Sequence, residues 1–255
     1  MTHPLPPSSP ASITGDDADA QAKRALAWAH TARFLITASK LSELPASELP
    51  EIAFVGRSNA GKSTAINMLT QQKRLAFASK TPGRTQHINL FELGPKLAPD
   101  ALFADLPGYG YAAVERSAKL RWQEVMAEYL AVRRSLSAIV VLVDARLGFT
   151  EIDRKLLSFV APRIANGSVK LLALLTKADK LNRRDTSAAL ERAGEVLAEV
   201  TSEEADVSLA AFSALSRAGV ADAARVLFDW VRAAASGAAQ APVAGDALPA
   251  GISQS

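Results

Sequence analysis

The stretch that decides the fold is I-A-F-V-G-R-S-N-A-G-K-S, residues 52–63. Its first four residues are apolar and predict a buried strand, and residues 64–69 indicate the first turns of a helix. Residues 56–63 match the pattern G-x-x-x-x-G-K-[ST], which between a strand and a helix is typical of a phosphate-binding loop. A chance glycine-rich turn with an exposed lysine is the alternative, and the flanking strand and helix disfavour it.

Each part of this loop has a chemical reason to contact phosphate. Gly56 and Gly61 let the backbone turn tightly, so that successive N–H groups point at phosphate oxygens. A helix that begins near Lys62 adds its positive end, and the lysine offers a point charge to the outer phosphates. The Ser63 hydroxyl is a candidate ligand for Mg²⁺. The predicted phosphate-binding residues are Gly56, Arg57, Ser58, Asn59, Ala60, Gly61, Lys62 and Ser63.

Composition restricts the class of protein. The chain has 255 residues, of which 49% are apolar, which suffices for one domain of about 200 residues with a large core. It holds no apolar run of about 18 residues, so no membrane span is expected. Residues 1–20 contain no Lys or Arg and no long apolar stretch, which argues against a secretory signal. Because cysteine is absent, disulfides and thiolate metal sites are excluded. We expect a cytoplasmic monomer.

The two ends of the chain differ from its middle. Residues 1–20 and 234–255 are rich in Pro, Ser, Ala or Gly, so we expect a disordered leader and a disordered tail around a folded domain of residues 21–233. The net charge is +3, but the terminal segments hold four acidic residues and no Lys or Arg, which leaves +7 on residues 21–232. A polyanionic partner such as RNA and a merely solvated basic surface explain this charge equally well.

The middle of the chain alternates between strand-like and helix-like segments. Residues 139–143 and 171–175 are apolar throughout, without the polar alternation of a half-exposed strand. Such strands are covered on both faces, so the predicted fold class is α/β, a mostly parallel sheet between two helix layers. Strands are predicted over residues 51–55, 87–93, 101–105, 138–144, 169–175 and 207–212, and helices over 62–70, 114–134, 151–164, 186–200 and 217–232, with a further helix near 17–31.

In such folds the ligand lies beyond the carboxyl ends of the strands, and polar residues follow several of them. Asp105-Leu106-Pro107-Gly108 comes after one predicted strand. Asp105 can hold Mg²⁺ through its water shell, and Gly108 can offer its backbone N–H to a terminal phosphate. A turn with a capping aspartate is the alternative, but the position about forty residues after a phosphate loop favours the nucleotide role.

A polar segment, residues 79–86, separates the phosphate loop from the next strand. It contains Gly and Pro and has no hydrophobic period, which predicts a mobile loop. A terminal phosphate and Mg²⁺ could order such a loop, and hydrolysis could release it. Thr85 is the candidate for the hydroxyl that completes the metal shell, and Thr81 is the rival.

Two further strand ends suit a guanine base. Asp179, in the segment Thr176-Lys177-Ala178-Asp179, can accept both the ring imino and the exocyclic amine protons of guanine. Adenine lacks that pair of donors, so it would leave the carboxylate partly unsatisfied. The stem of Lys177 can lie along the base. At the last strand end we expect backbone N–H groups of Phe212, Ser213 and Ala214 to meet the guanine carbonyl.

Taken together, these motifs closely resemble the EngB family (YsxC or YihA) of bacterial ribosome-biogenesis GTP-binding proteins, in the TrmE-Era-EngA-EngB-Septin-like superfamily. The resemblance covers roughly residues 20–232 and rests on G-R-S-N-A-G-K-S, T-P-G-R-T-Q, D-L-P-G-Y-G-Y-A, T-K-A-D-K-L and F-S-A-L-S. It implies a six-stranded Ras-like P-loop domain that uses GTP or GDP with Mg²⁺. It also implies association with the large ribosomal subunit or its precursors, and a need for the protein in normal cell division and septation.

The resemblance also assigns roles to residues. It places Ser63 and Thr85 on Mg²⁺ and implies two nucleotide-sensing switches, residues 83–87 and 105–108. No catalytic residue is certain; Lys62, Thr85 and Gly108 are candidate transition-state contacts. Besides residues 56–63, the nucleotide-binding set is Gly83, Arg84, Thr85, Gln86, His87, Asp105, Leu106, Pro107, Gly108, Thr176, Lys177, Ala178, Asp179, Phe212, Ser213 and Ala214.

Two positions depart from the wider GTPase pattern. Thr176 stands where most GTPases have Asn, so guanine affinity is expected to be modest while specificity, which rests on Asp179, survives. Tyr109 stands where Ras-like enzymes carry a water-orienting Gln, so intrinsic hydrolysis should be slow, on the order of 10⁻⁴ s⁻¹. K⁺ bound at Asn59 is one candidate helper, as in potassium-activated GTPases, and the ribosome is another. A solvent-facing loop residue is an equally good interpretation of Asn59.

Aromatic and basic residues follow the second switch and suit contact with RNA. We expect Tyr109, Tyr111, Arg116 and Lys119 to face a ribosomal partner. A second group has helical spacing and is predicted to pack in the core: Trp122, Met126, Tyr129 and Leu130.

Three functions compete at this point. The first is a GTP-driven assembly switch in which slow hydrolysis acts as a timer. The second is a nucleotide-stabilised module that docks RNA or protein and whose turnover is incidental. The third, an ATP-using kinase, is disfavoured by Asp179 and by the lack of an evident lid with catalytic arginines.

Overall fold

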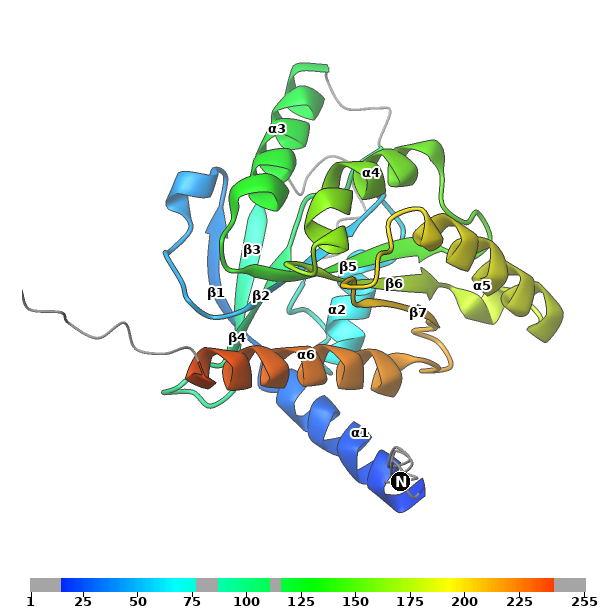
Figure 1. Cartoon of the computed structure of the whole chain (residues 1–255), viewed down its shortest axis with the longest axis horizontal. Helices are drawn as coiled ribbons and strands as arrows, with labels where there is room; N and C mark the ends of the chain where they lie inside the picture. The colour runs from blue at the N-terminus through cyan, green and yellow to red at the C-terminus, as the bar shows by residue number, and fades with distance from the viewer. Residues whose placement is uncertain (1–14, 77–86, 111–115, 241–255) are drawn as a thin grey trace, which may run out of the picture.

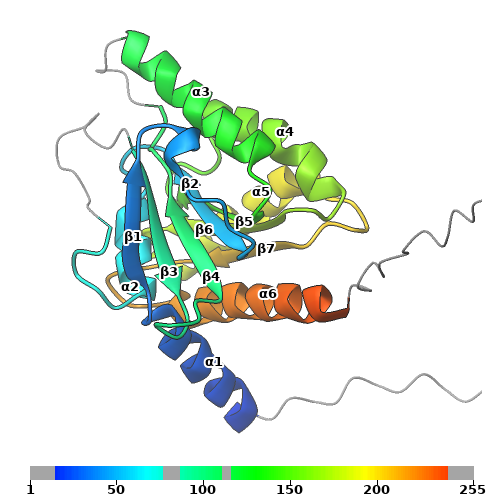
Figure 2. The same cartoon turned by 90° about the vertical axis from the view of Figure 1, so that its left-hand side faces the viewer.

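The computed structural model describes residues 15–76, 87–110 and 116–240, which form one seven-stranded sheet with helices on both faces (Figures 1 and 2). The α/β class is therefore confirmed. The strands are β1 (Arg33–Ala38), β2 (Glu51–Gly56), β3 (Ile88–Leu93), β4 (Ala101–Asp105), β5 (Leu136–Asp144), β6 (Lys170–Thr176) and β7 (Val207–Ala211). The helices are α1 (Gly15–Ala29), α2 (Lys62–Leu69), α3 (Arg116–Val132), α4 (Glu151–Ala165), α5 (Arg183–Ala198) and α6 (Val220–Gln240), with short 3₁₀ turns η1 (Leu41–Glu43) and η2 (Ala178–Lys180).

The strand order is β1-β3-β4-β2-β5-β6-β7, and β3 runs in the opposite direction to the other six strands. Five adjacent strands, from β4 to β7 in this order, are parallel, as their apolar sequences predict. The count of six strands was one too low, because β1 was not predicted. Strand β1 lies at the edge of the sheet, where Phe34 is 57% exposed. An edge strand needs neither a continuous apolar run nor a clean alternation, so its sequence carries a weak strand signal.

Alternate residues of each central strand enter two separate cores. Ile52 and Phe54 of β2 pack with α1, α2 and α6, whereas Ala53 and Val55 pack with α3, α4 and α5. Figure 2 shows α1 and α6 on one side of the sheet and α3 and α4 on the other. This arrangement leaves the loops at the carboxyl ends of the parallel strands available for a ligand.

The terminal helices extend beyond the predicted folded domain. Helix α1 begins at Gly15, inside the predicted leader, and α6 continues to Gln240, inside the predicted tail. Alanine, which made both ends look like low-complexity segments, is also the best helix former. The two helices pack together near the rings of Trp28 and Phe228, whose centroids are 5.6 Å apart.

A buried acid fixes the end of the sheet that lies opposite the carboxyl ends of the parallel strands. Glu51, at the start of β2, is fully buried, and its Oε2 accepts a 2.6 Å hydrogen bond from the Tyr129 hydroxyl. The Arg133 guanidinium pairs with the same carboxylate. These contacts tie the end of α3 to the sheet. Within the described ranges, no helix combines the length and apolarity that crossing a bilayer requires.

Candidate nucleotide-binding site

Four of the predicted segments meet at one edge of the sheet. Residues 57–61 follow β2, residues 105–108 close β4, residues 177–179 follow β6 and residues 212–214 follow β7. Because β4, β2, β5, β6 and β7 are adjacent and parallel, their carboxyl ends lie side by side (Figure 1). The structure therefore brings these four segments together at the carboxyl ends of the parallel strands.

The phosphate loop needs glycine at both glycine positions of its sequence pattern. A Cβ atom at Gly56 would lie 2.8 Å from the Leu142 carbonyl oxygen, which is closer than real contacts allow. Gly61 has a φ of +95° and is the N-cap of α2, a backbone conformation that side chains disfavour. The loop therefore turns tightly and leads directly into a helix whose positive end faces the site.

The phosphate loop is joined to the segment after β4 by backbone contacts. The Ser58 N–H donates to the Tyr109 carbonyl at 2.9 Å, and the Tyr109 N–H donates to the Gly56 carbonyl at 3.3 Å. A Cβ atom at Gly108 would lie 3.3 Å from the Ser58 Cα, so glycine permits this close approach. Two sequence-distant loops thus form one surface.

Lys62 and Asp105 form an ion pair at the centre of the site. Lys62 is 8% exposed and Asp105 is fully buried. The ion pair uses Asp105 Oδ1, whereas Oδ2 is buried and has no hydrogen-bond partner among the described residues. A buried carboxylate oxygen without a partner is costly, and a water molecule of a metal shell would satisfy it. The site therefore fits the Mg²⁺ that the sequence predicts.

The segment after β6 supports the phosphate loop from the other side. The Thr176 hydroxyl donates to the Ala60 carbonyl at 2.6 Å, so the shorter side chain that replaces Asn still reaches the loop. Lys177, in the left-handed conformation with a φ of 58°, donates its ammonium to the Asn59 carbonyl at 2.8 Å. Both side chains hold the phosphate loop to the base-reading segment.

Asp179 is oriented by a neighbour whose side chain the sequence did not single out. The buried Ser213 hydroxyl donates to Asp179 Oδ1 at 2.7 Å and accepts the Ser216 N–H at 3.1 Å. The hydrogen bond from Ser213 keeps the pKa of Asp179 below its usual range. The carboxylate is therefore ionised and ready to accept hydrogen bonds at neutral pH.

The predicted use of backbone N–H groups at the last strand end is wrong for two residues. The Phe212 N–H donates to the Leu175 carbonyl at 2.8 Å, and the Ser213 N–H donates to the Ala218 carbonyl at 3.0 Å. Phe212 instead packs its ring in the core. Ala214 remains as the candidate donor to a guanine carbonyl.

Comparisons with known proteins agree with this geometry. Residues 51–177 match the protein family described as "50S ribosome-binding GTPase". A probable GTP-binding protein EngB of Acidovorax ebreus (strain TPSY) is 59% identical over 205 residues, which cover 80% of this chain and 90% of the relative. Another, of Polaromonas sp. (strain JS666 / ATCC BAA-500), is 54% identical over 230 residues and 90% of each chain.

The chain belongs to the EngB family of GTP-binding proteins.

Solved structures support the fold of this EngB-family chain. The crystal structure of a probable GTP-binding protein engB superposes with a TM-score of 0.53 at 23% identity, over 72% of this chain and 99% of that one. Era in complex with MgGDPNP and nucleotides 1506–1542 of 16S ribosomal RNA gives a TM-score of 0.57 at 19% identity, over 72% of this chain and 57% of that one. The EngB-family chain is therefore a P-loop GTPase that binds guanine nucleotide, and the ATP-kinase alternative is set aside.

Tyr109 of this EngB-family chain is buried, which corrects the expectation that it faces a partner. It is 6% exposed, and its hydroxyl donates to Asp153 Oδ1 at 2.7 Å. Asp153 also caps α4 by accepting from the Thr150 N–H at 2.8 Å and the Thr150 hydroxyl at 2.6 Å. Burial, with the nearby Asp153 carboxylate, raises the pKa of the Tyr109 phenol far above its ordinary value.

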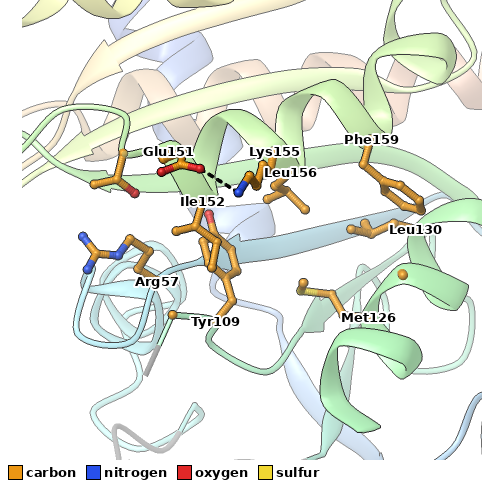
Figure 3. Close-up of a pocket in the computed structure, with 12 residues that line it drawn as sticks. Arg57, Tyr109, Met126, Leu130, Glu151, Ile152, Lys155, Leu156 and Phe159 are labelled. Atoms are coloured by element: carbon orange, nitrogen blue, oxygen red, sulfur yellow. Dashed lines mark ion pairs between the residues drawn. The ribbon is translucent and has the colours of Figure 1, made fainter. Parts of the chain in front are cut away.

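A cleft of about 620 Å³ lies next to Tyr109, between α3 and α4 (Figure 3). Met126 and Leu130 of α3 face Leu156 and Phe159 of α4 across it, and Glu151 pairs with Lys155 at its rim. Tyr129 and Leu130 are buried and Met126 is partly buried, so the predicted core role of these three is confirmed.

Several predicted residues lie outside the described part of the chain. These are Thr81, Gly83, Arg84, Thr85, Gln86 and Tyr111, together with the side chains of Arg116, Lys119 and Trp122. His87, by contrast, is described: it is exposed, and its Nδ1 lies 2.9 Å from the Ser39 hydroxyl.

Two charged residues near the site were missed. Asp144 ends β5, and Arg146 follows it. The strand-end rule that found Asp105 and the base-reading segment applies equally to this strand, since β5 lies between β2 and β6. Asp144 lacked only a familiar motif around it.

Proposed function

We propose that this EngB-family GTPase is a GTP-driven switch in assembly of the large ribosomal subunit. Slow hydrolysis would act as its timer, and the protein would be needed for normal cell division and septation. The observation that carries the proposal is the match of residues 51–177, from β2 to Lys177, to a family of 50S ribosome-binding GTPases. We further propose that it works in the cytoplasm as a monomer.

The residues at the site support Mg²⁺ as the partner of the nucleotide. Ser63, at the start of α2, and Thr85 would hold the ion, with Asp105 bound to it through water. This assignment is supported by Asp105 Oδ2, which is buried and has no hydrogen-bond partner in the described part of the chain. When bound, the ion would neutralise charge that develops on the phosphoryl group. Lys62 and the N–H groups of the loop orient the outer phosphates.

Slow intrinsic hydrolysis is supported by the position of Tyr109. Its ring is buried and its hydroxyl is bound to Asp153, so it is not available to orient an attacking water. We propose a rate on the order of 10⁻⁴ s⁻¹ without assistance. K⁺ held by Asn59, whose side chain is exposed, is a candidate accelerator. Turnover in KCl and NaCl at equal ionic strength tests this: equal rates exclude the K⁺ role.

The net charge of +7 on residues 21–232 supports a partner rich in phosphate, such as ribosomal RNA. Era, which shares this fold, has been solved in complex with 16S ribosomal RNA. We propose that Tyr111, Arg116 and Lys119, which follow the second switch, contact the ribosomal partner when GTP is bound. Tyr109 is withdrawn from this surface because it is buried.

Sedimentation of large-subunit precursors with the protein bound to GDP, GTP or a non-hydrolysable analogue tests the proposal. We expect co-sedimentation with GTP and the analogue and little with GDP. Charge reversal of Arg116 and Lys119 to Glu should weaken it, whereas Arg192→Glu, on the exposed side of α5, serves as the control. Binding that ignores the nucleotide would contradict the switch.

The docking module with incidental turnover makes a different prediction. If hydrolysis is the timer, the non-hydrolysable analogue should trap the protein on precursors and delay their maturation. If docking alone matters, the precursors should mature at the same rate with the analogue as with GTP.

A further inference from the structure

Asp144 lies at the carboxyl end of β5, between the phosphate loop and the base-reading segment. It is 8% exposed, and four donors surround its carboxylate, one of which is the Arg146 backbone N–H, 3.1 Å from Oδ1. Arg146 donates from Nε to Oδ1 at 2.9 Å and from Nη2 to Oδ2 at 2.7 Å. The Lys177 ammonium donates to Oδ2 at 2.9 Å. The acid is thus mostly buried and held between two cations.

The same Lys177 ammonium reaches the phosphate loop. It donates to the Asn59 carbonyl at 2.8 Å, in a loop where Asn59 has a φ of 67°. One ammonium therefore bridges the end of β5 and the left-handed turn of the loop. Within the described part of the chain, these two acceptors are the hydrogen-bond partners recorded for Lys177 Nζ.

We propose that Asp144 is a positioning residue for nucleotide binding, which acts by holding the Lys177 ammonium against the Asn59 carbonyl. The lysine stem is then kept beside the base, and the loop is kept in its left-handed turn. This role rests on the assignment of Lys177 to the guanine site.

Lysine needs such a partner because its ammonium is strongly hydrated and its four-carbon stem is flexible. A neutral carbonyl such as that of Asn59 competes poorly with water, whereas a carboxylate gives a charge-assisted hydrogen bond. Asp144 is itself held by the guanidinium of Arg146, which donates to both carboxylate oxygens. These hydrogen bonds keep the pKa of Asp144 far below its ordinary value. The acid therefore stays charged throughout the pH range in which nucleotide binds.

Arg146 should matter less than Asp144. Its side chain is 49% exposed, and its guanidinium donates to Asp144. Removal of the guanidinium leaves the Lys177–Asp144 contact in place. Removal of the Asp144 charge leaves Lys177 beside Arg146 without an acid between them, so the ammonium should turn toward water.

The test compares GDP and GTP affinities of three variants by fluorescence of a labelled nucleotide. Asp144→Asn should weaken both by about tenfold, mainly through faster dissociation. Arg146→Ala should change them by about twofold or less. Asp206→Asn is the matched control, because Asp206 pairs with Lys170 at 3.5 Å at the start of β6, far from the site. It should leave both affinities unchanged.

A double-mutant cycle separates positioning from general stabilisation. In a Lys177→Met background, Asp144→Asn should have no further effect on GDP affinity, because its effect passes through Lys177. A loss that persists there, or wild-type affinity in Asp144→Asn, overturns the proposal. Asp144→Ser is measured in parallel with Asp144→Asn. If neither of these two variants folds, the proposal is also overturned. A wild-type chain that does not bind GDP would instead refute the nucleotide site itself.

Discussion

The two halves of the nucleotide site are built differently. On the base side, residues 176–179 and 212–214, the functional side chains already have partners within the protein. On the phosphate side, residues 56–63 and 105–108, the central charges of Lys62 and Asp105 are paired with each other, and Asp105 Oδ2 has no partner among the described residues.

This difference indicates which half is preorganised. Thr176, Lys177 and Asp179 need no rearrangement to receive a base, since each is held by hydrogen bonds to other parts of the fold. A phosphate that takes Lys62 and a metal shell that takes Asp105 must separate the ion pair. We therefore propose that the base side gives specificity in every nucleotide state, whereas the phosphate side reports which phosphates are present.

The largest expected effect tests the base side. Asp179→Asn replaces one acceptor oxygen of the carboxylate by an NH₂ donor. One of the two guanine N–H donors then faces another donor, so GDP affinity should fall on the order of 10³-fold. Xanthosine diphosphate, which carries a carbonyl in place of the amine, should bind the variant better than GDP does. Isothermal titration with GDP, ADP and xanthosine diphosphate measures this. Unchanged preference for GDP would place guanine recognition elsewhere.

The next effect tests the phosphate side. Asp105→Asn should abolish most of the gain in affinity for a GTP analogue that Mg²⁺ gives the wild type, a loss of roughly one to two orders of magnitude. The preference for guanine over adenine should stay the same, because the base side is untouched. Titrations in Mg²⁺ and in a chelator provide the comparison. Equal metal dependence in both proteins would remove Asp105 from the metal shell.

A smaller effect is expected at the support of Asp179. Ser213→Ala removes the hydrogen bond that orients this acid and should weaken GDP binding about fivefold. The same bond depresses the pKa of Asp179, so its carboxylate stays charged as pH falls below the ordinary range. In the variant that pKa rises, and affinity should begin to fall at a higher pH than in the wild type. Ser216→Ala, at an exposed neighbouring serine, is the control.

The smallest effect is expected at Tyr109, which directly follows residues 105–108 of the phosphate side. Tyr109→Phe removes the hydrogen bond to Asp153 and should cost about 1 kcal/mol of unfolding free energy at pH 7, with nucleotide affinity nearly unchanged. Denaturant titration measures the loss. A large change in nucleotide affinity would mean that the Tyr109–Asp153 hydrogen bond belongs to the nucleotide site.

The pH dependence gives Tyr109 a second signature. Because burial keeps its phenol neutral in the folded state, only the unfolded state loses this proton above the ordinary pKa of 10.0. Unfolding free energy therefore falls as pH rises above 10, and Tyr109→Phe should make that fall shallower. Tyr129, which is buried against Glu51, should preserve part of it in the variant.

The sequence predicted those parts of the site that depend on local order. The phosphate loop, Asp105 and the base-reading segment each follow an apolar run that could only be a buried strand. What it could not predict depends on distant partners. The Tyr109 hydroxyl is bound to Asp153, and the Ser213 hydroxyl is bound to Asp179, in each case far away in the sequence. The edge strand β1 exists because it pairs with β3, and Asp144 gains its role from Lys177.

Hydrogen exchange of the backbone amides, compared among the free protein, its GDP complex and its complex with a non-hydrolysable GTP analogue, tests the central claim most directly. We predict that residues 176–179 and 212–214 gain the same protection from both nucleotides, whereas residues 105–108 gain further protection only with the analogue and Mg²⁺. Equal protection of residues 105–108 by GDP and by the analogue would contradict the account.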